Sequence, residues 1–500
     1  MSNLSDLIPA GGGQNNTDFV ADGAITSGKP VILNSTGTVK QVGYDVITDS
    51  IGSENNLNGS YSVQGDSVMA YDPVLNQTLF VFGDMENTQY GYARVLSISG
   101  STVTLGAKAL FFNTAGYQGG SVVNIGSGKY FIACTADVGG YMYGTVASVS
   151  GTTVTFGTQI VINSAQTYLS KQGLAYSSTT DAIAMIAHYS SVNYLWRFTV
   201  SGTTITNDTS AKVTLTSVLN DGAGSGTTSQ IVRNTTTDEL FVAWKKSAGA
   251  SAAYGGVIEM AAGGGSGSFT GGSAVAFTSD LKGMYGGGVT WDSTNDRYVV
   301  VYSLNTNDYQ AYSVASTSSG VTTWGTETTF NSVAGDANFI SFDPKVSKVV
   351  TTLNPDSSPY PRNYVTGVVS GTSITWGTPV TLTSAASSDL YQLYDSTLEK
   401  TLMVYKRSSR AYLVIYEVGG NVTNLTATNL LGIASGAILD TATGTINTWG
   451  SRNEVQTGLT IGSDYYVQED GTITTTSTSP AQLIGTAISA TQINIKDYTG

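Results

Sequence analysis

The sequence predicts an all-β protein with a seven-bladed β-propeller and a small β-rich module. The C-terminal segment forms this module, either alone or together with the N-terminal segment. A pattern of two apolar runs joined by a turn recurs seven times, roughly every 50 to 58 residues. Each copy has room for four strands, which is the content of a propeller blade. Hardly any segment shows the 3.6-residue apolar period of a helix.

The first half of each copy predicts a hairpin whose first strand ends in a turn-forming residue. Asp72, Asp292, Asp343 and Asp395 recur at this point. An Asp at the start of a turn accepts a hydrogen bond from the backbone two residues on. We therefore interpret these residues as structural and not catalytic. The second apolar runs are residues 79–82, 130–133, 184–187, 240–243, 298–301, 349–351 and 402–405.

The second half of each copy predicts a third and a fourth strand. Tyr-rich third strands are expected at residues 90–95, 141–146, 194–200, 309–314, 364–369 and 412–418. Turns such as Ser150-Gly151-Thr152 then lead into the fourth strand, since Gly accepts the positive φ of a tight hairpin. The copies through residues 263–272 and 316–321 predict irregular hairpins. The last copy lacks a good fourth strand. We expect residues 39–48 to supply it, which would close the ring and remove an exposed edge.

The repeat divides the chain into three parts. Residues 1–36 are predicted to hold a leader and strands, residues 37–423 the propeller, and residues 424–500 a C-terminal β-rich module. Asp470-Gly471 is a strong hairpin signal within the last part. The two ends are also expected to fold together, with the propeller inserted between them.

Composition excludes several classes of function. Only 11% of the residues are charged, against about 25% in an ordinary soluble domain. The net charge of −13 argues against binding to nucleic acid, whose phosphates would repel the protein. No apolar run approaches the roughly 20 residues that cross a bilayer, so membrane insertion is not expected. The N-terminus lacks the basic and apolar regions of a signal peptide.

Few residues suit catalysis or metal binding. Cys134 is the only cysteine and His188 the only histidine, which leaves no His- or Cys-based metal site and no Ser–His pair. We predict no enzyme activity, no cofactor and no metal, although a Ca²⁺ site at residues 292–296 or 305–308 stays open. The acids that could serve a glycan-cleaving enzyme are Asp84, Glu86, Asp137, Asp280, Asp308, Asp336 and Asp356.

The loops that join second to third strands, with those between blades, are the better candidates for binding. Tyr offers a flat apolar face and a hydroxyl, which suits recognition of sugars. The alternative is that a Tyr opening each third strand packs between blades. The predicted receptor-binding residues are Tyr90, Tyr117, Tyr141, Tyr189, Tyr194, Tyr254, Tyr285, Tyr309 and Tyr360.

Both ends of the chain resemble fibre and appendage proteins of marine and cyanobacterial tailed phages. The resemblance lies in Met1-Ser2-Asn3-Leu4-Ser5-Asp6-Leu7-Ile8-Pro9-Ala10-Gly11, in residues 27–35 and 37–39, and in residues 424–429, 458–460, 465–468, 470–472 and 485–491. It implies a virion protein whose ends attach to other tail or capsid proteins, with a middle that binds a host-surface glycan or protein. By analogy with fibres, a homotrimer is expected. The alternatives are a capsid-decorating or tail-assembly protein without a receptor, and a glycan-cleaving virion enzyme.

Overall fold

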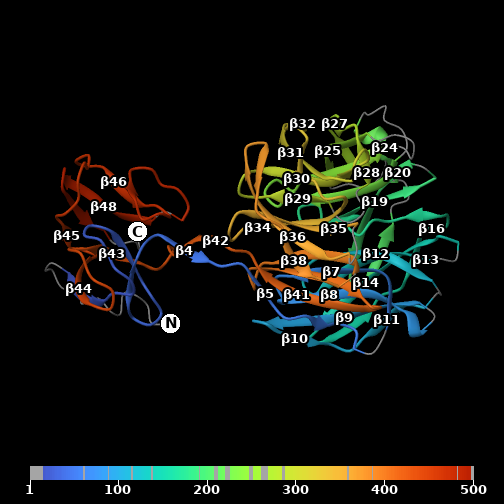
Figure 1. The fold of residues 1–500 in the computed structure, drawn as a ribbon, viewed down its shortest axis with the longest axis horizontal. Helices are drawn as coiled ribbons and strands as arrows, with labels where there is room; N and C mark the ends of the chain where they lie inside the picture. Colours follow the sequence, from blue (N-terminus) through green and yellow to red (C-terminus); the bar gives the residue numbers. More distant parts are fainter. Residues whose placement is uncertain are drawn as a thin grey trace. The chain divides into compact units, whose positions relative to one another are not determined.

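The structure is a computed structural model that describes residues 15–59, 62–87, 89–113, 116–136, 139–190, 192–207, 212–219, 226–246, 252–260, 269–283, 288–356, 360–385, 387–480 and 482–496. The chain forms two compact units. Unit 1 combines residues 1–48 with residues 419–500, and unit 2 holds residues 49–418. In Figure 1 the blue N-terminal and red C-terminal segments accordingly share one unit.

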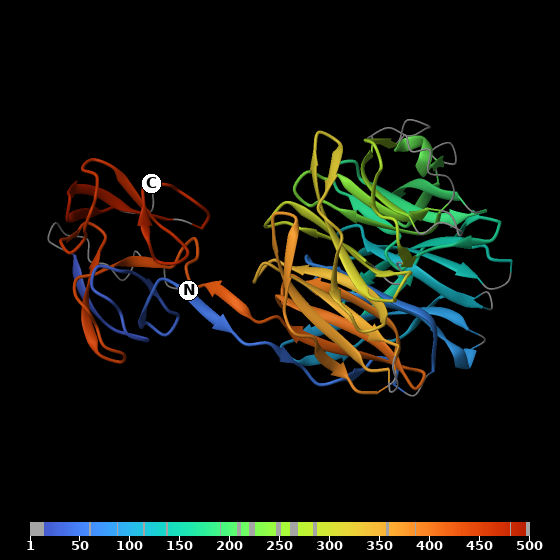
Figure 2. The same ribbon diagram turned by 45° about the horizontal axis from the view of Figure 1, so that its top comes forward.

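Unit 2 is built almost entirely of antiparallel strands, so the predicted all-β class is confirmed. In its described part seven sheets follow one another along the chain (Figures 1 and 2). The first sheet has β7 (Val63–Asp72), β8 (Gln77–Asp84), β9 (Tyr90–Ser99), β10 (Thr102–Leu105) and β11 (Ala109–Phe112). The second has β12 (Tyr117–Asn124), β13 (Lys129–Ala136), β14 (Met142–Ser150), β15 (Thr153–Phe156) and β16 (Ile160–Asn163). The third has β17 (Thr167–Tyr168), β18 (Leu174–Ser177), β19 (Ala182–Tyr189), β20 (Val192–Ser201), β21 (Thr204–Asn207) and β22 (Val213–Thr214).

The remaining sheets of unit 2 repeat this order. The fourth has β23 (Gly226–Arg233), β24 (Leu240–Lys246), β25 (Ala253–Met260), β26 (Phe269–Gly271) and β27 (Val275–Thr278). The fifth has β28 (Leu281–Gly283), β29 (Val289–Asp292), β30 (Arg297–Leu304), β31 (Gln310–Ser318), β32 (Val321–Trp324) and β33 (Thr328–Asn331). The sixth has β34 (Gly335–Asp343), β35 (Lys348–Pro355), β36 (Arg362–Ser370), β37 (Ser373–Trp376) and β38 (Val380–Thr383). The seventh has β39 (Ser388–Asp395), β40 (Lys400–Arg407) and β41 (Arg410–Glu417), with β5 (Ser50–Ile51) and β6 (Asn55–Asn56).

Successive sheets pack face to face through their first two strands. The first strands contact one another in the order β7, β12, β18, β23, β29, β34 and β39, and β39 contacts β7. Side chains alternate across a strand, so Phe80 of β8 packs with Leu402 of the seventh sheet, whereas Val81 packs with Ile132 of the second. Burial on both faces explains why the second strands read as continuous apolar runs.

The turn after each first strand has the predicted structural role. Asp72, Asp292, Asp343 and Asp395 each accept a hydrogen bond from the backbone N–H two residues later. Asn124 and Asn234 do the same in the second and fourth sheets. In the third sheet the Ser177 hydroxyl accepts from the backbone N–H of Thr180, three residues later. Four residues after each of these seven positions the backbone has a positive φ, between 47° and 74°. The turns therefore share one backbone conformation, capped by one side chain.

Glycines that follow the short fourth strands let neighbouring sheets approach closely. A Cβ added at Gly157 would lie 2.3 Å from the carbonyl oxygen of Thr203 in the next sheet. Gly106 stands in the same relation to Thr152, at 2.4 Å. Gly157 stands in the step Phe156-Gly157-Thr158, which recurs as Trp324-Gly325-Thr326 and Trp376-Gly377-Thr378. At Gly157 and Gly325 the step marks a contact between sheets where no side chain fits.

Two sequence predictions were wrong: the irregular hairpin at residues 316–321 and the closing strand at residues 39–48. The fifth sheet has a regular two-residue hairpin, with Ser318 paired to Val321, because Gly320 supplies positive φ at the turn. The seventh sheet is completed by β5 and β6, and not by residues 39–48. Those residues form β3 (Val39–Gln41) and β4 (Tyr44–Ile47) of unit 1, where β4 gains a full partner strand in β42 (Gly420–Thr423).

The described part of unit 1 consists of two sheets and a two-stranded ribbon, β4 with β42. Its first sheet has the order β1 (Asn16–Val20), β44 (Thr443–Thr448), β43 (Leu430–Ala434), β2 (Pro30–Leu33) and β3. Its second sheet has the order β45 (Arg452–Asn453), β49 (Gln492–Ile495), β48 (Gln482–Ser489), β46 (Asp464–Val467) and β47 (Ile473–Thr474). Strands from both ends of the chain pair directly in the first sheet, as β1 does with β44.

The described helices are short. The α-helix α1 (Leu215–Val218) and the 3-10 helix η2 (Met85–Asn87) each make about one turn. In the described part of the chain, no helix has the length and apolar character needed to cross a membrane.

Candidate functional site

The two ends of unit 2 differ in construction. The turn end carries the capped turns after the first strands and the hairpins before the fourth. The loop end carries the connections from second to third strands, such as residues 408–409 between β40 and β41. Asp49, the first residue of unit 2, belongs to the turn end, where its carboxylate accepts a hydrogen bond from the Tyr416 hydroxyl at 2.6 Å. The loop end is thus opposite to the points where the chain enters and leaves unit 2.

The predicted tyrosines fall into three groups. Tyr141 and Tyr360 are 39% and 49% exposed at the loop end. Tyr90, Tyr189, Tyr194, Tyr254 and Tyr309 are half-buried. Tyr117 is 1% exposed and meets Phe111 edge-on in the core between the first two sheets, so its side chain offers no surface to a receptor. Tyr285 lies outside the described residues.

The half-buried tyrosines mostly pack on neighbouring rings. Tyr254 stacks on Trp244 with ring centroids 6.0 Å apart, and Tyr309 packs against the core between the fourth and fifth sheets. Tyr189 and Tyr194 surround the Lys212 ammonium, which lies 4.9 Å and 4.4 Å from their ring centres. Burial lowers the pKa of Lys212. These rings are largely occupied by intramolecular contacts, as the packing alternative predicts.

An exposed tyrosine that the site prediction omitted lies in the third sheet. Tyr168 is 55% exposed, and its ring lies 5.9 Å from that of His188. Neither nitrogen of His188 has a hydrogen-bond partner among the residues that the structure describes. Burial lowers the pKa of this histidine, so its ring is a neutral packing element at neutral pH.

The middle of unit 2 is crossed by the segment between β17 and β18. The carbonyl of Lys171 accepts from the Ser121 hydroxyl of the second sheet at 3.0 Å. Its ammonium donates to the carbonyl of Leu390 in the seventh sheet at 3.3 Å. The adjacent Gln172 donates to the carbonyl of Val289 in the fifth sheet at 2.7 Å. One short segment therefore joins sheets that are not neighbours, and fills the space where their first strands converge.

Three of the candidate carboxylates, Asp84, Asp308 and Asp336, are engaged in ion pairs. Asp84 is fully buried and its Oδ2 lies 2.5 Å from the ammonium of Lys108. The ammonium of Lys282 lies 2.9 Å from Asp308 and 3.6 Å from Asp336. This is the one place where the contacts of the described residues bring two of the predicted acids to a common group. Asp137 lies outside the described residues. No cluster of three or more potential metal-binding His, Cys, Asp or Glu side chains occurs in the described ranges.

An open cleft lies at the loop end between the sixth and seventh sheets. Its volume is about 400 Å³. Its lining joins an exposed aromatic side chain to hydroxyl, amide and cationic groups from both sheets. These residues are Asn354, Tyr360, Arg362, Ser387, Ser388, Lys406, Ser408 and Ser409. Only Tyr360 among them was predicted. The sequence carries one signal for the cleft, the short two-residue connection at residues 408–409.

The floor of the cleft is held in place by hydrogen bonds. Arg362 is 4% exposed, and its guanidinium donates to the carbonyl of Ser387 at 2.5 Å and to its hydroxyl at 3.2 Å. Tyr360 has a φ of 58°. For a bulky residue this conformation is an outlier of the kind that clusters at ligand sites.

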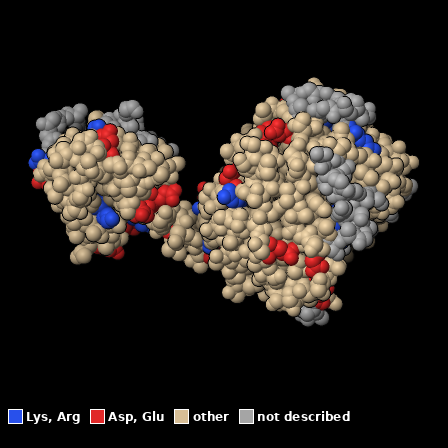
Figure 3. All heavy atoms as spheres, turned by 90° about the horizontal axis from the view of Figure 1, so that it is seen from above, with Lys and Arg blue, Asp and Glu red and all other residues tan. Residues whose placement is uncertain are grey.

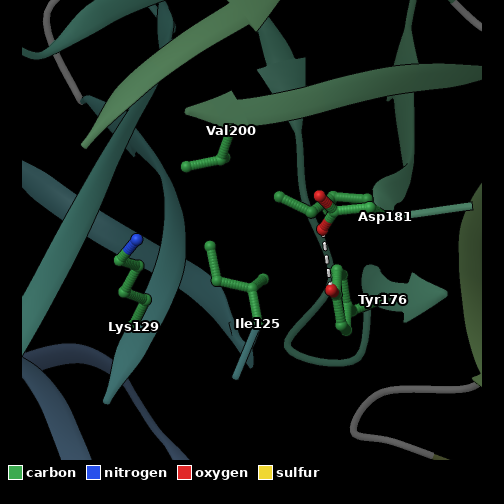
Figure 4. A pocket seen from close by; sticks show the side chains of 6 residues that line it. Ile125, Lys129, Tyr176, Asp181 and Val200 are labelled. Atoms are coloured by element: carbon green, nitrogen blue, oxygen red, sulfur yellow. Dashed lines mark hydrogen bonds between the residues drawn. The ribbon is translucent and has the colours of Figure 1, made fainter. Parts of the chain in front are cut away.

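Two smaller pockets lie at the turn end. The first has a volume of about 110 Å³ and is lined by Ile125, Lys129, Tyr176, Asp181, Ile183 and Val200 (Figure 4). The Tyr176 hydroxyl donates to the Asp181 carboxylate at 2.8 Å, and burial, followed by that bond, raises the pKa of Tyr176 to about 12. The second, of about 220 Å³, is lined by Val257, Glu259, Thr270, Gly271, Gly272, Ser319 and Gly320 and has no aromatic residue.

Charged side chains are sparse over the side of the molecule seen in Figure 3, where most of the surface is neither acidic nor basic. Recognition by such a surface depends on hydroxyl, amide and aromatic groups more than on charge.

Comparisons with known proteins bear on the fold. No family model matches the chain, and no curated protein does. Among solved structures, the BP39L lectin from Burkholderia pseudomallei is similar with a TM-score of 0.51 and 11% identity, over 73% of this chain and 99% of the lectin. The NanB sialidase from Streptococcus pneumoniae has a TM-score of 0.42 and 10% identity, over 74% of this chain and 70% of its own. The β-propeller domain of the Trilobed protease from Pyrococcus furiosus has a TM-score of 0.40 and 8% identity, over 72% and 97%. At such identities the likeness concerns the fold alone.

Proposed function

We propose that this protein is a virion adhesin of a tailed phage, whose loop end binds a host-surface receptor. In this proposal unit 2 is a seven-bladed propeller, closed by the contact of β39 with β7. Unit 1 attaches to other tail or capsid proteins, and the protein acts as a homotrimer. The resemblance of both chain ends to phage fibre proteins supports the virion role.

One observation carries the binding role: the functional groups and the chain ends of unit 2 lie at opposite ends. The exposed Tyr141 and Tyr360 and the cleft of about 400 Å³ lie at the loop end, whereas the chain enters at Asp49 on the turn end. A receptor bound at the loop end would leave the chain ends of unit 2 unobstructed. Several copies on one particle would add avidity to weak single contacts.

The test is binding of the purified full-length protein to host cells, and competition of that protein with infection. We expect cell binding and a dose-dependent block of infection. Protein that assembles into the particle but neither binds cells nor blocks infection would instead favour the structural, receptor-free role.

The enzyme alternative can be tested at Asp308 and Asp336, which both contact Lys282. A glycan-cleaving enzyme of the common kind needs two carboxyl groups at one site, and Asp308 and Asp336 both lie within 4 Å of Lys282. Incubation with host polysaccharide should release no product if the protein is an adhesin. Product release that is abolished by Asp308→Asn or Asp336→Asn, with cell binding retained, would replace the adhesin by the enzyme.

A further inference from the structure

We infer that the cleft between the sixth and seventh sheets is a sugar-binding site in which a pyranose ring stacks on Tyr360. The inference rests on the proposed function and makes it specific, because it names the place on the loop end and the chemical class of the receptor. Nothing in the recurring pattern points to this cleft, since its lining residues are those that differ between sheets.

The first step is the match between the groups of the cleft and those of a sugar. A pyranose ring presents C–H groups on one face and hydroxyl groups around its rim. Tyr360 supplies a flat apolar surface that is 49% exposed, which suits the C–H face. Ser408 and Ser409, with the amide of Asn354, supply hydroxyl and amide groups that both donate and accept hydrogen bonds.

The second step is preorganisation. Arg362 is buried and hydrogen-bonded to Ser387, and Ser408 and Ser409 form a tight turn with φ values of 48° and 61°. Groups that are already ordered lose little conformational freedom when a ligand binds. The left-handed conformation of Tyr360 has a local cost, and a role in presenting the ring to a ligand accounts for it.

The third step is comparison with the other described pockets. The pocket of Figure 4 is about a quarter of the size, and its tyrosine hydroxyl is already bonded to Asp181. The pocket beside Glu259 has no aromatic surface. Of these three pockets, the cleft of Tyr360 is the one that combines an exposed aromatic ring with several hydroxyl and amide groups.

The experiment is binding of the full-length protein to an immobilised panel of neutral and acidic oligosaccharides, alongside binding to host cells. We expect at least one oligosaccharide to bind, and Tyr360→Ala to weaken that binding about tenfold or more. Tyr360→Phe keeps the ring and should stay within about threefold of the unmodified protein. Tyr168→Ala is the matched control, because Tyr168 is a similarly exposed tyrosine at the loop end of another sheet. Thermal unfolding of each variant separates lost binding from lost folding.

Each other outcome identifies which proposal fails. Loss of oligosaccharide binding in Tyr168→Ala but not in Tyr360→Ala would contradict the sugar site in the cleft, while the proposed adhesin function would stand. Binding to cells without binding to any oligosaccharide would contradict a sugar as the receptor and would indicate a protein receptor. Oligosaccharide binding without binding to cells would support the cleft and overturn the adhesin. Failure of both assays would overturn both proposals.

Discussion

The carboxylate of Asp72 accepts a hydrogen bond from the side-chain amide of Asn124 at 3.0 Å, which joins the capped turn of the first sheet to that of the second. The same carboxylate oxygen accepts from the backbone N–H of Gly128 at 2.7 Å, while its other oxygen caps its own turn. A fully buried carboxylate is tolerated here because four N–H donors from two sheets satisfy it. The recurring aspartates therefore stabilise the propeller-like array of sheets and are not part of the loop-end site.

Exchange of this pair tests its contribution to stability. Asp72→Asn and Asn124→Asp should each lower the free energy of unfolding by roughly 1–3 kcal/mol, because one places two amides, and the other two carboxylates, face to face. The double exchange should recover part of the loss, since it restores one donor and one acceptor group. Chemical denaturation measures the free energy of unfolding of the unmodified protein, of the two single variants and of the double variant. Exposed Glu86→Ala is the control and should change little. Strict additivity of the two single losses would show that the side chains do not interact.

Two glycines of the same motif should respond differently to an added methyl group. At Gly157 the new Cβ would lie 2.3 Å from the Thr203 carbonyl oxygen, whereas at Gly377 the nearest atom would be 3.5 Å away. We expect Gly157→Ala to lower the free energy of unfolding by roughly 1–3 kcal/mol through overpacking. Gly377→Ala should stay within about 0.5 kcal/mol, since an ordinary contact costs little. Thermal unfolding of both variants provides the measurement, and equal losses would contradict the close approach of the second and third sheets.

Asp343 should make stability depend on pH. Burial raises its pKa to about 6, although hydrogen bonds from the backbone N–H groups of Lys345 and Val346 partly lower it. Its Oδ2 has no hydrogen-bond partner among the described residues. The folded state therefore favours the protonated acid. The stability from this group is fully present below about pH 4, and is lost as the pH rises through about 6.

Asp343→Asn should remove this loss, because the second and fourth sheets already carry Asn at the equivalent position. We expect the variant to gain roughly 1–3 kcal/mol at pH 7, with a flatter pH profile from about 4 to 6. Asp292→Asn is the control, since Oδ2 of Asp292 accepts from Asn295 at 2.8 Å. The measurement is denaturant unfolding across the pH range. A destabilised Asp343→Asn at pH 7 would show that the charged form is the favoured one.

Asn58 should be the key residue at the closure of the seventh sheet. It is fully buried, and its side-chain oxygen accepts from the backbone N–H of Ala411 at 2.8 Å. Asn58→Ala leaves this buried N–H without its acceptor and should cost roughly 1–3 kcal/mol. Asn55→Ala removes only a local bond to Ser53 and should cost less than about 1 kcal/mol. Calorimetric melting distinguishes the two, and a neutral Asn58→Ala would show that residues before β7 do not hold the seventh sheet together.

The parts of the fold that were predicted depend on short-range patterns. Apolar runs separated by Asp72-Pro73 or by Gly151 determine strands and turns locally, because turn chemistry acts over two to four residues. The all-β class and the structural role of the aspartates followed from these patterns. Strands β5 and β6 were missed because two-residue strands such as Asn55–Asn56 carry no apolar alternation.

The sequence by itself determined the sevenfold recurrence, the capped turns and the abundance of tyrosine in the loops. Only the tertiary structure decided which of these tyrosines are available. Tyr117 is buried between sheets, whereas Tyr360 is exposed beside Arg362 and Lys406. The physical reason is distance along the chain: the cleft joins residues from two sheets, and Lys171 reaches Leu390 across 219 positions. Such contacts arise from the packing of whole sheets, which no local pattern encodes.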